Sequence, residues 1–199
     1  MRLTTHFFAA GILGGALLLT GCQRSDENVQ AARETTTDTG DRAKAVLNDT
    51  DRDFLKKAEE GDIKEQNLGR WMLERTQNKD VKDYAQMLVD DHSKDLRNLV
   101  DLMNQKGMPQ PKGLPEVKHE AMAKLQDLSG TALDREFTMM MVEDHQKDVT
   151  DFRNMANRAH DKDVKDYAMN TVPTLQKHLR KAQELEDKEN MSRATPRTK

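Results

Sequence analysis

The chain has 199 residues and one cysteine, and 34% of its residues are charged against 35% hydrophobic. A single cysteine excludes an internal disulfide scaffold and any zinc or iron-sulfur site built from several cysteines. The formal net charge of −3 provides no overall attraction to nucleic acid. Ten glycines and five prolines are few for the many turns of a long all-β chain, so the composition favours helices.

The first residues have the pattern of a secretion signal. Residues 7–19 are nearly uncharged and follow Arg2, but they are too few and too rich in glycine for a membrane-spanning helix of about 20 residues. The stretch ends in Leu-Thr-Gly-Cys at residues 19–22, which resembles the lipobox of bacterial lipoproteins. This resemblance implies that residues 1–21 are a signal peptide and that the Cys22 thiol receives a lipid. An ordinary cleaved signal and an uncleaved anchor are the alternatives.

A lipid at Cys22 would decide where the protein is held. Several acyl chains, at about 0.8 kcal/mol per buried methylene, would hold it to a bilayer essentially permanently. Gln23, rather than Asp, after the cysteine resembles the pattern sent to the outer membrane of a Gram-negative cell. We therefore expect a protein anchored in the cell envelope, at the outer membrane facing the periplasm. Its expected partner is the membrane, another envelope protein is a second candidate partner, and nucleic acid is not expected.

The segment between residues 51 and 187 has the periodicity of amphipathic helices. Apolar residues recur there at steps of three and four, with charged residues between them. This predicts four helices of about 26 residues each, the first capped by Thr50. Short turns near Asn78 and His160 would pair neighbouring helices as antiparallel hairpins.

The predicted fold is therefore an all-α four-helix bundle of two hairpins joined by one long crossover. The crossover covers residues 107–133 and has room for a short helix within 117–128. Its direction remains open, so the two turns lie either at one end of the bundle or at opposite ends. Residues 22–50 and 188–199 are polar, which predicts a flexible tether and a polar tail.

One heptapeptide occurs twice in the chain. Lys-Asp-Val-Lys-Asp-Tyr-Ala stands at residues 79–85 and again at 162–168. Each copy opens the second helix of a predicted hairpin. The repeat therefore predicts two related hairpins, packed with pseudo-symmetry, that place similar groups at similar positions.

Four ionisable residues, one on each predicted long helix, interrupt the apolar stripes: Glu65, His92, His145 and His178. Each stands three, four or seven residues from apolar neighbours and therefore points inward with them. At 1.5 Å per residue all four lie about 20 to 27 Å from the nearest turn. They are therefore expected to meet near the middle of the bundle.

Three imidazoles and one carboxylate suit a transition metal ion such as zinc, copper or iron. Asp95 and Asp148 each stand three residues after a histidine, and we expect them to orient the imidazoles or to supply further ligands. The alternative is a network of buried histidines and one glutamate that only hydrogen-bond to one another. The sequence leaves these two readings open.

Several motifs together resemble a known family. They are Asp-Ile-Lys-Glu at 62–65, Met-Leu-Val-Asp-Asp-His at 87–92, Leu-Asp-Arg-Glu-Phe at 133–137, Met-Val-Glu-Asp-His at 141–145 and the stretch around Pro173 at 172–179. The chain resembles the ferritin-like family of bacterial envelope proteins catalogued as domain of unknown function 4142 and described as outer-membrane proteins. The resemblance spans about residues 50–187 and implies a ferritin-like fold. It also places Glu65, His92, His145 and His178 on recurrent positions of the family.

The resemblance does not extend to a di-iron enzyme centre. Di-iron carboxylate proteins of this fold use Glu-x-x-His on two helices, whereas here Val89, Val142 and Leu175 stand three residues before the histidines. We therefore expect no ferroxidase or oxygenase activity. The favoured function is a lipid-anchored envelope bundle that binds a transition metal in stress tolerance or metal handling. The alternatives are a structural or interaction module without metal and, third, a redox enzyme.

Overall fold

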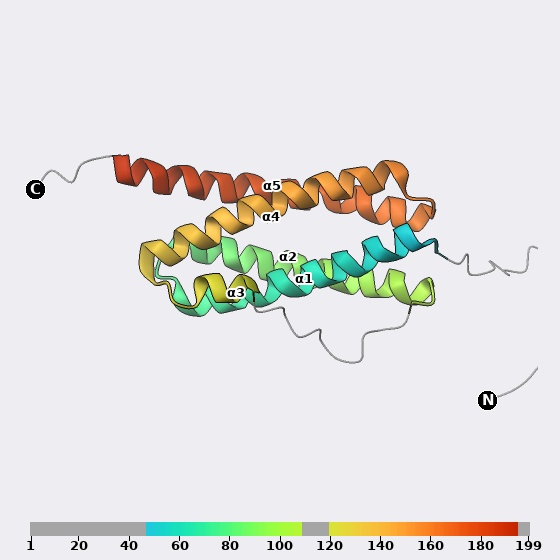
Figure 1. The fold of residues 1–199 in the computed structure, drawn as a ribbon, viewed down its shortest axis with the longest axis horizontal. Helices are drawn as coiled ribbons and strands as arrows, with labels where there is room; N and C mark the ends of the chain where they lie inside the picture. Colours follow the sequence, from blue (N-terminus) through green and yellow to red (C-terminus); the bar gives the residue numbers. More distant parts are fainter. Residues whose placement is uncertain (1–46, 109–119, 195–199) are drawn as a thin grey trace, which may run out of the picture. The chain divides into compact units, whose positions relative to one another are not determined.

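The computed structural model describes residues 47–108 and 120–194, so the predicted signal peptide, Cys22 and most of the predicted tether lie outside the described residues. Five helices form: α1 (Asp49–Arg75), α2 (Lys79–Gln105), α3 (Glu120–Leu125), α4 (Gly130–Arg158) and α5 (Lys162–Ala194), all drawn in Figure 1. The all-helical prediction is confirmed, since these two ranges contain no strand. Within them, no helix is long and apolar enough to cross a membrane.

The four long helices pack side by side as two antiparallel hairpins, α1 with α2 and α4 with α5 (Figure 1). The turn at 159–161 lies beside the start of α1, where the Asp51 carboxylate accepts hydrogen bonds from the backbone N–H groups of His160 (3.1 Å) and Asp161 (2.8 Å). The turn at 76–78 lies beside the start of α4, where the Thr76 hydroxyl donates to Asp134 Oδ1 at 2.6 Å. The two turns therefore lie at opposite ends of the helices.

Both outer boundaries of the helical region differ from the predicted ones. Asn48, and not Thr50, caps α1, because its side chain accepts the backbone N–H of Asp51 at 2.7 Å while the preceding Leu47 is buried. Asn is as good a cap as Thr, so the sequence offered two equivalent starts. At the other boundary α5 continues to Ala194, so part of the predicted polar tail is helical.

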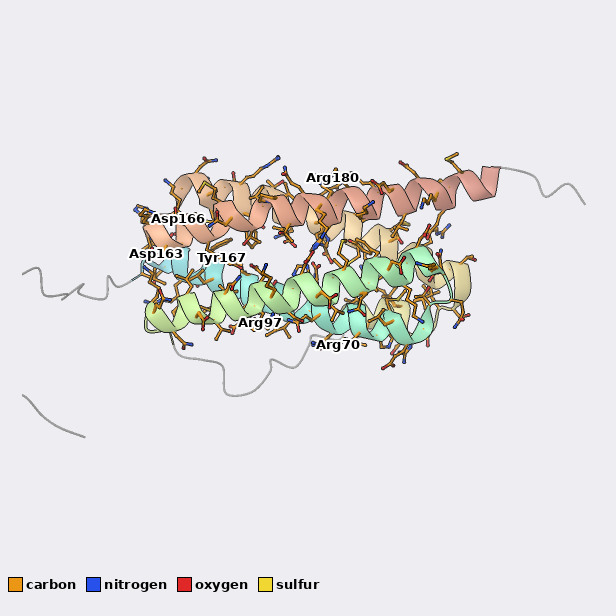
Figure 2. All side chains as sticks on the ribbon, turned by 180° about the vertical axis from the view of Figure 1, so that it is seen from behind. Arg70, Arg97, Asp163, Asp166, Tyr167 and Arg180 are labelled. Carbon is orange, nitrogen blue, oxygen red and sulfur yellow. The ribbon has the colours of Figure 1, made fainter. Side chains whose placement is uncertain are left out.

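The core consists of two apolar clusters separated by a polar layer. One cluster includes Phe54, Leu99, Phe152 and Val164, and the other includes Leu68, Leu88, Phe137 and Leu185. On each long helix a buried ionisable residue stands between the parts that belong to the two clusters. Charged side chains such as Arg70, Arg97 and Arg180 lie on the outside (Figure 2). The interior is therefore apolar at both ends and polar in the middle.

The two hairpins make matching contacts with each other. Residues 83 positions apart correspond, because this is the spacing of the repeated heptapeptide. The rings of Phe54 and Tyr167 lie 6.2 Å apart, and those of their counterparts Phe137 and Tyr84 lie 6.1 Å apart. Tyr167 projects from α5 toward the other hairpin (Figure 2). The sequence repeat therefore corresponds to a pseudo-twofold relation between the hairpins.

Gly69 allows α1 and α2 to approach each other closely. A Cβ atom at this position would lie 2.9 Å from the backbone oxygen of Ala85 and 2.8 Å from Cγ2 of Val89. The backbone of α2 therefore leaves no room for a side chain on α1 here. This contact lies within the hairpin that carries Glu65 and His92.

Candidate metal centre

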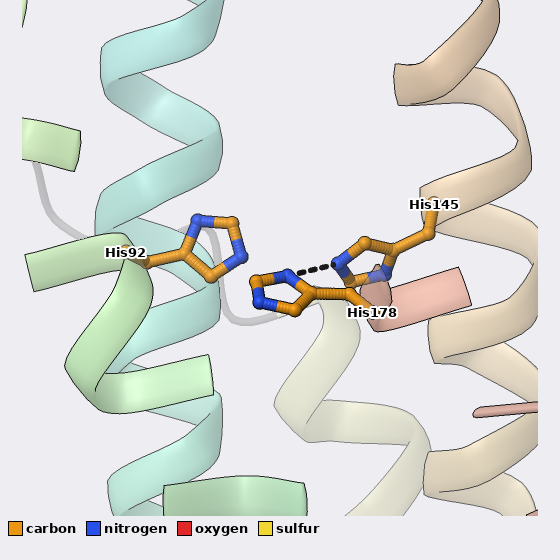
Figure 3. Close-up of side chains that lie close together, drawn as sticks. All are labelled: His92, His145 and His178. Atoms are coloured by element: carbon orange, nitrogen blue, oxygen red, sulfur yellow. Dashed lines mark hydrogen bonds between the residues drawn. The ribbon is translucent and has the colours of Figure 1, made fainter. Parts of the chain in front are cut away.

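The structure brings together the four inward-facing residues predicted from the sequence. Glu65 comes from α1, His92 from α2, His145 from α4 and His178 from α5, and Figure 3 shows the three imidazoles turned toward one another. Their exposed fractions are 1%, 5%, 0% and 0%. Each stands on the buried stripe of its helix, so packing of the apolar residues on either side places it at the centre.

The donor atoms at the centre lie at distances suited to shared coordination of one ion. Glu65 Oε2 lies 2.9 Å from His92 Nε2 and 3.2 Å from His145 Nε2. His145 Nε2 lies 3.2 Å from His178 Nδ1, and one nitrogen from each of the three rings lies within 4.8 Å of the others. Ligands placed tetrahedrally at about 2.0 to 2.1 Å from zinc are separated by about 3.3 Å. The observed separations are close to that value.

Hydrogen bonds on the outer side of each ring decide which nitrogen faces the centre. His145 Nδ1 donates to the carbonyl oxygen of Met141 at 2.9 Å, since a carbonyl can only accept. His178 Nε2 donates to the Asp91 carboxylate at 2.9 Å. His92 Nδ1 lies 2.8 Å from Asp62 Oδ1. In neutral rings the inner nitrogens therefore carry lone pairs, which is the arrangement that metal-binding histidines require.

Two atoms of the centre are buried without a hydrogen-bond partner. They are His92 Nε2 and Glu65 Oε2, which lie 2.9 Å apart and form an ion pair only when the imidazole is protonated. A buried polar atom left unpaired costs about 1 to 3 kcal/mol, more if it is charged. A cation among these atoms would offset that cost, so the residues present fit a metal ion.

The electrostatics of the centre depend on Glu65. Burial alone would raise the pKa of Glu65, but the charges of His145 and His92, with Lys64, hold its pKa well below the ordinary value. Burial likewise disfavours the charged form of His92, yet the Glu65 carboxylate and the hydrogen bond with Asp62 raise the pKa of His92 well above its usual range. The Glu65 side chain is therefore an ionised carboxylate at neutral pH.

Burial favours the neutral forms of two further groups, His178 in the centre and Asp62 beside it. Burial, with the neighbouring charges of His92 and His145, lowers the pKa of His178 to about 4. Burial raises the pKa of Asp62 to about 7, although its hydrogen bond to His92 opposes this shift. A neutral imidazole at His178 has the lone pair that a metal ligand needs.

The two aspartates predicted to orient the imidazoles, Asp95 and Asp148, lie beside the centre, but neither is hydrogen-bonded to a histidine ring. Asp95 accepts hydrogen bonds from the hydroxyls of Tyr167 (2.7 Å) and Thr171 (3.4 Å) on α5 instead of orienting His92. Asp148 is half-buried near Glu65 and His145, and burial raises its pKa to about 6. The carboxylates that hold His92 and His178 are thus on other helices, and His145 is held by the Met141 carbonyl one turn before it on its own helix.

The sequence reasoning missed the two carboxylates that do hold imidazoles, Asp62 and Asp91. Asp62 could have been found, because it stands four residues after Ala58 and three before Glu65 and is therefore on the same stripe. Asp91 precedes His92 directly and lies off the stripe of α2. Its contact with His178 depends on how α2 and α5 pack, for which the sequence has no comparable signal.

A pocket of about 740 Å³ opens beside the centre, between α1 and α4. It reaches His92 and Glu65, and most of the charged residues that line it are acidic. The Lys64 ammonium, which also lines it, pairs with Asp144 across the two helices at 2.8 Å. The pocket gives a cation an acid-lined route to the histidine cluster.

Comparison with known proteins assigns the family. Residues 36–185 match the family described as Domain of unknown function (DUF4142). The chain belongs to this family. No curated protein matches it significantly. The DUF4142 chain is also similar to the crystal structure of a DUF305 fragment from Deinococcus radiodurans, with a TM-score of 0.62 and 19% identity over 71% of this chain and 98% of the fragment. At that identity the similarity shows the fold alone.

Proposed function

We propose that this DUF4142 protein binds one transition metal ion, zinc, copper or iron, through Glu65, His92, His145 and His178. One observation carries the proposal: the inner ring nitrogens and Glu65 Oε2 face one another, while the outer nitrogens are already held by hydrogen bonds. Neutral imidazole and carboxylate are donors that all three of these ions accept.

A buried site with four protein ligands is better suited to holding a metal ion than to catalysing a reaction at it. Catalytic zinc sites keep one position open for water or substrate, whereas structural sites use four protein ligands. Glu65, His145 and His178 are at most 1% exposed. When bound, the ion would supply a positive charge that joins the four long helices in the middle of the bundle. Metal handling, or stress tolerance that depends on it, is the function we propose.

The proposed setting is the cell envelope, with a ferritin-like four-helix bundle carried on a lipid anchor at Cys22. The apolar run ending in Leu-Thr-Gly-Cys and the Gln23 that follows support an outer-membrane lipoprotein facing the periplasm. The packing of two hairpins with turns at opposite ends supports the ferritin-like comparison. Expression of Cys22→Ser in bacteria fed a radiolabelled fatty acid tests the anchor. We expect labelling to be abolished, and persistent labelling would refute the assignment.

A metal-free structural or interaction module is the second candidate. His145 Nε2 and His178 Nδ1 have hydrogen-bond geometry at 3.2 Å, and a proton between them would hold the layer together without metal. The raised pKa of His92 favours a second metal-free contact, a charged pair of the protonated His92 imidazole with the Glu65 carboxylate at 2.9 Å. A redox enzyme is the third candidate, and the single inner carboxylate makes it less suited to a di-iron centre.

Metal analysis of the purified full-length chain distinguishes these candidates. Zinc, copper and iron are titrated separately into wild type and His145→Ala, and the bound metal per chain is measured by mass spectrometry after dialysis. We expect one tightly bound ion in the wild type and loss of binding in His145→Ala. His160→Ala is the matched control, because that exposed histidine lies in a turn. Equal metal content in wild type and His145→Ala would contradict the proposal.

A further inference from the structure

An ion pair between α1 and α4 covers the contact that these two helices make in the metal centre. Glu65 Oε2 on α1 lies 3.2 Å from His145 Nε2 on α4, and both side chains are at most 1% exposed. The residues that precede them, Lys64 and Asp144, pair at 2.8 Å, and their side chains are 33% and 29% exposed. Because consecutive residues of a helix point about 100° apart, the Lys64–Asp144 pair lies on the solvent side of the buried contact. The pair therefore closes this half of the α1–α4 interface.

The other half of the same interface has no equivalent pair. With the spacing of 83 residues, the counterpart of Lys64 is Lys147, but the counterpart of Asp144 is Gly61, which has no carboxylate. A Cβ atom at Gly61 would meet nothing within 4 Å. Lys147 pairs instead with Asp151 on its own helix, where the two side chains are 72% and 49% exposed. The interface is therefore closed on one side of the pseudo-twofold axis and open at Gly61 on the other.

The pocket between α1 and α4 connects the open half of the interface with the metal centre. Its lining includes Gly61 and Lys147 at the open half, and Glu65 and His92 at the centre. On the opposite face of the bundle, α2 and α5 pack against each other more closely than α1 and α4 do. A path from solvent to the histidine cluster therefore runs past Gly61.

We propose that the metal ion of the histidine cluster enters and leaves past Gly61, while the Lys64–Asp144 pair keeps the other half of the interface closed. This inference rests on the proposed metal site and adds that the bound ion exchanges with ligands in solution. A buried site without such an opening would release its ion only when the helices separate locally. An open path suits metal handling, in which an ion is taken up and passed on, better than it suits a purely structural ion.

Gly61→Asp tests the proposal, because it supplies the carboxylate that the open half lacks. The Lys147–Asp151 pair is exposed and contributes little to stability, so Lys147 can exchange it for a carboxylate at position 61. We expect zinc uptake and zinc release each to slow about two- to fivefold, the effect of one partly exposed ion pair, with the dissociation constant unchanged. A negative charge without the new pair would act in the opposite direction on uptake, since it attracts a cation.

Stopped-flow measurements on the full-length chain give both rates, as zinc uptake by the metal-free protein and zinc release to an excess of a chromophoric chelator. Gly61→Ala controls for the loss of glycine, and Gly61→Asp combined with Lys147→Met controls for the new ion pair. Both should exchange zinc at least as fast as wild type. Lys64→Met opens the closed half and should speed uptake and release by similar factors. Circular dichroism establishes that each variant is folded.

The outcomes separate this path from the metal site itself. If zinc binds but Gly61→Asp exchanges it as fast as wild type, or slows exchange equally without Lys147, the path past Gly61 is overturned. Slower release matched by tighter binding would overturn it as well, because an ion pair at the opening changes both rates and not the affinity. Wild-type rates in Lys64→Met would contradict the role of the Lys64–Asp144 pair. Absence of zinc binding in the wild type would contradict the metal site, and this inference with it.

Discussion

His145 Nε2 lies 3.2 Å from His178 Nδ1, and the other nitrogen of each ring is already engaged, with the Met141 carbonyl and the Asp91 carboxylate respectively. Two neutral rings held in this way direct lone pairs at each other. A cation between them, either a proton or a metal ion, is what makes the arrangement favourable. The predictions below separate these two cations and test the packing that holds the rings in place.

Removing the Asp91 carboxylate should weaken metal binding without removing a ligand. Asp91 accepts from His178 Nε2, and loss of an outer acceptor of this kind typically reduces metal affinity about 10- to 100-fold. We expect that reduction in the zinc affinity of Asp91→Ala, measured by competition with a chromophoric chelator. Asp90→Ala is the control, because Asp90 is exposed and accepts only a surface hydrogen bond from Gln86. Equal affinities in the two variants would mean that His178 is not a ligand.

Zinc should stabilise the wild-type chain against heat and leave His178→Ala unchanged. A ligand that binds only the folded state at 100 times its dissociation constant stabilises that state by about 2.7 kcal/mol. His178 is fully buried, so the variant's own melting temperature should fall as well. The informative quantity is therefore the shift on adding zinc, measured by calorimetry. A shift as large in His178→Ala as in wild type would contradict the assignment.

The stability of the metal-free chain should depend on pH through Asp148. Burial, with the negative charge of Glu65, raises the pKa of Asp148 from 3.8 to about 6. The folded state therefore holds this proton more tightly than the unfolded state, so stability falls as pH rises from about 3.8 to 6. Asp148→Asn removes the titrating group. The free energy of unfolding of Asp148→Asn relative to wild type should therefore increase across that range, by about 3 kcal/mol in total above pH 7.

Urea unfolding of wild type and Asp148→Asn at several pH values in a chelating buffer measures this difference. Asp101→Asn, on the exposed face of α2, is the matched control. A stability difference between wild type and Asp148→Asn that stays constant from pH 4 to 7.5 would show that burial does not raise the pKa of the Asp148 carboxyl.

Two glycines of α1 should respond in opposite directions to replacement by alanine. A Cβ at Gly69 would lie 2.9 Å from the Ala85 carbonyl, whereas at Gly61 it would meet nothing within 4 Å. Gly69→Ala should therefore lower the free energy of unfolding by about 1 to 3 kcal/mol through overpacking. Gly61→Ala should raise it by about 0.5 to 1 kcal/mol, because alanine favours a helix interior. Gly69→Ala as stable as wild type would contradict the close approach of α1 and α2.

The sequence predicted the helices and the inward-facing residues because one physical signal governs both. A periodicity near 3.6 identified each long helix, and the same count showed that Glu65, His92, His145 and His178 interrupt the apolar stripes. These residues lie on buried faces of their helices, so their convergence needed no knowledge of how the hairpins pack. The cap at Asn48 and the end of α5 were misjudged because neighbouring polar residues are nearly equivalent there.

What the sequence could not predict depends on contacts between helices. The placement of the turns at opposite ends is shown by Asp51 beside His160, a contact between residues 109 positions apart. The partner of His178 is Asp91 on α2, which no count along α5 can identify. Asp95 looked like an acceptor for His92, but Tyr167 and Thr171 on α5 occupy its oxygens. Local periodicity fixes which face is buried, whereas packing decides which neighbour each polar atom meets.

The most direct measurement is an anomalous difference map from crystals of the zinc-loaded full-length chain, recorded on both sides of the zinc absorption edge. We predict one strong peak within coordination distance, about 2.0 to 2.2 Å, of Glu65, His92, His145 and His178 donor atoms. A chain that crystallises in a zinc-containing solution with no peak among these four side chains would contradict the proposed metal site.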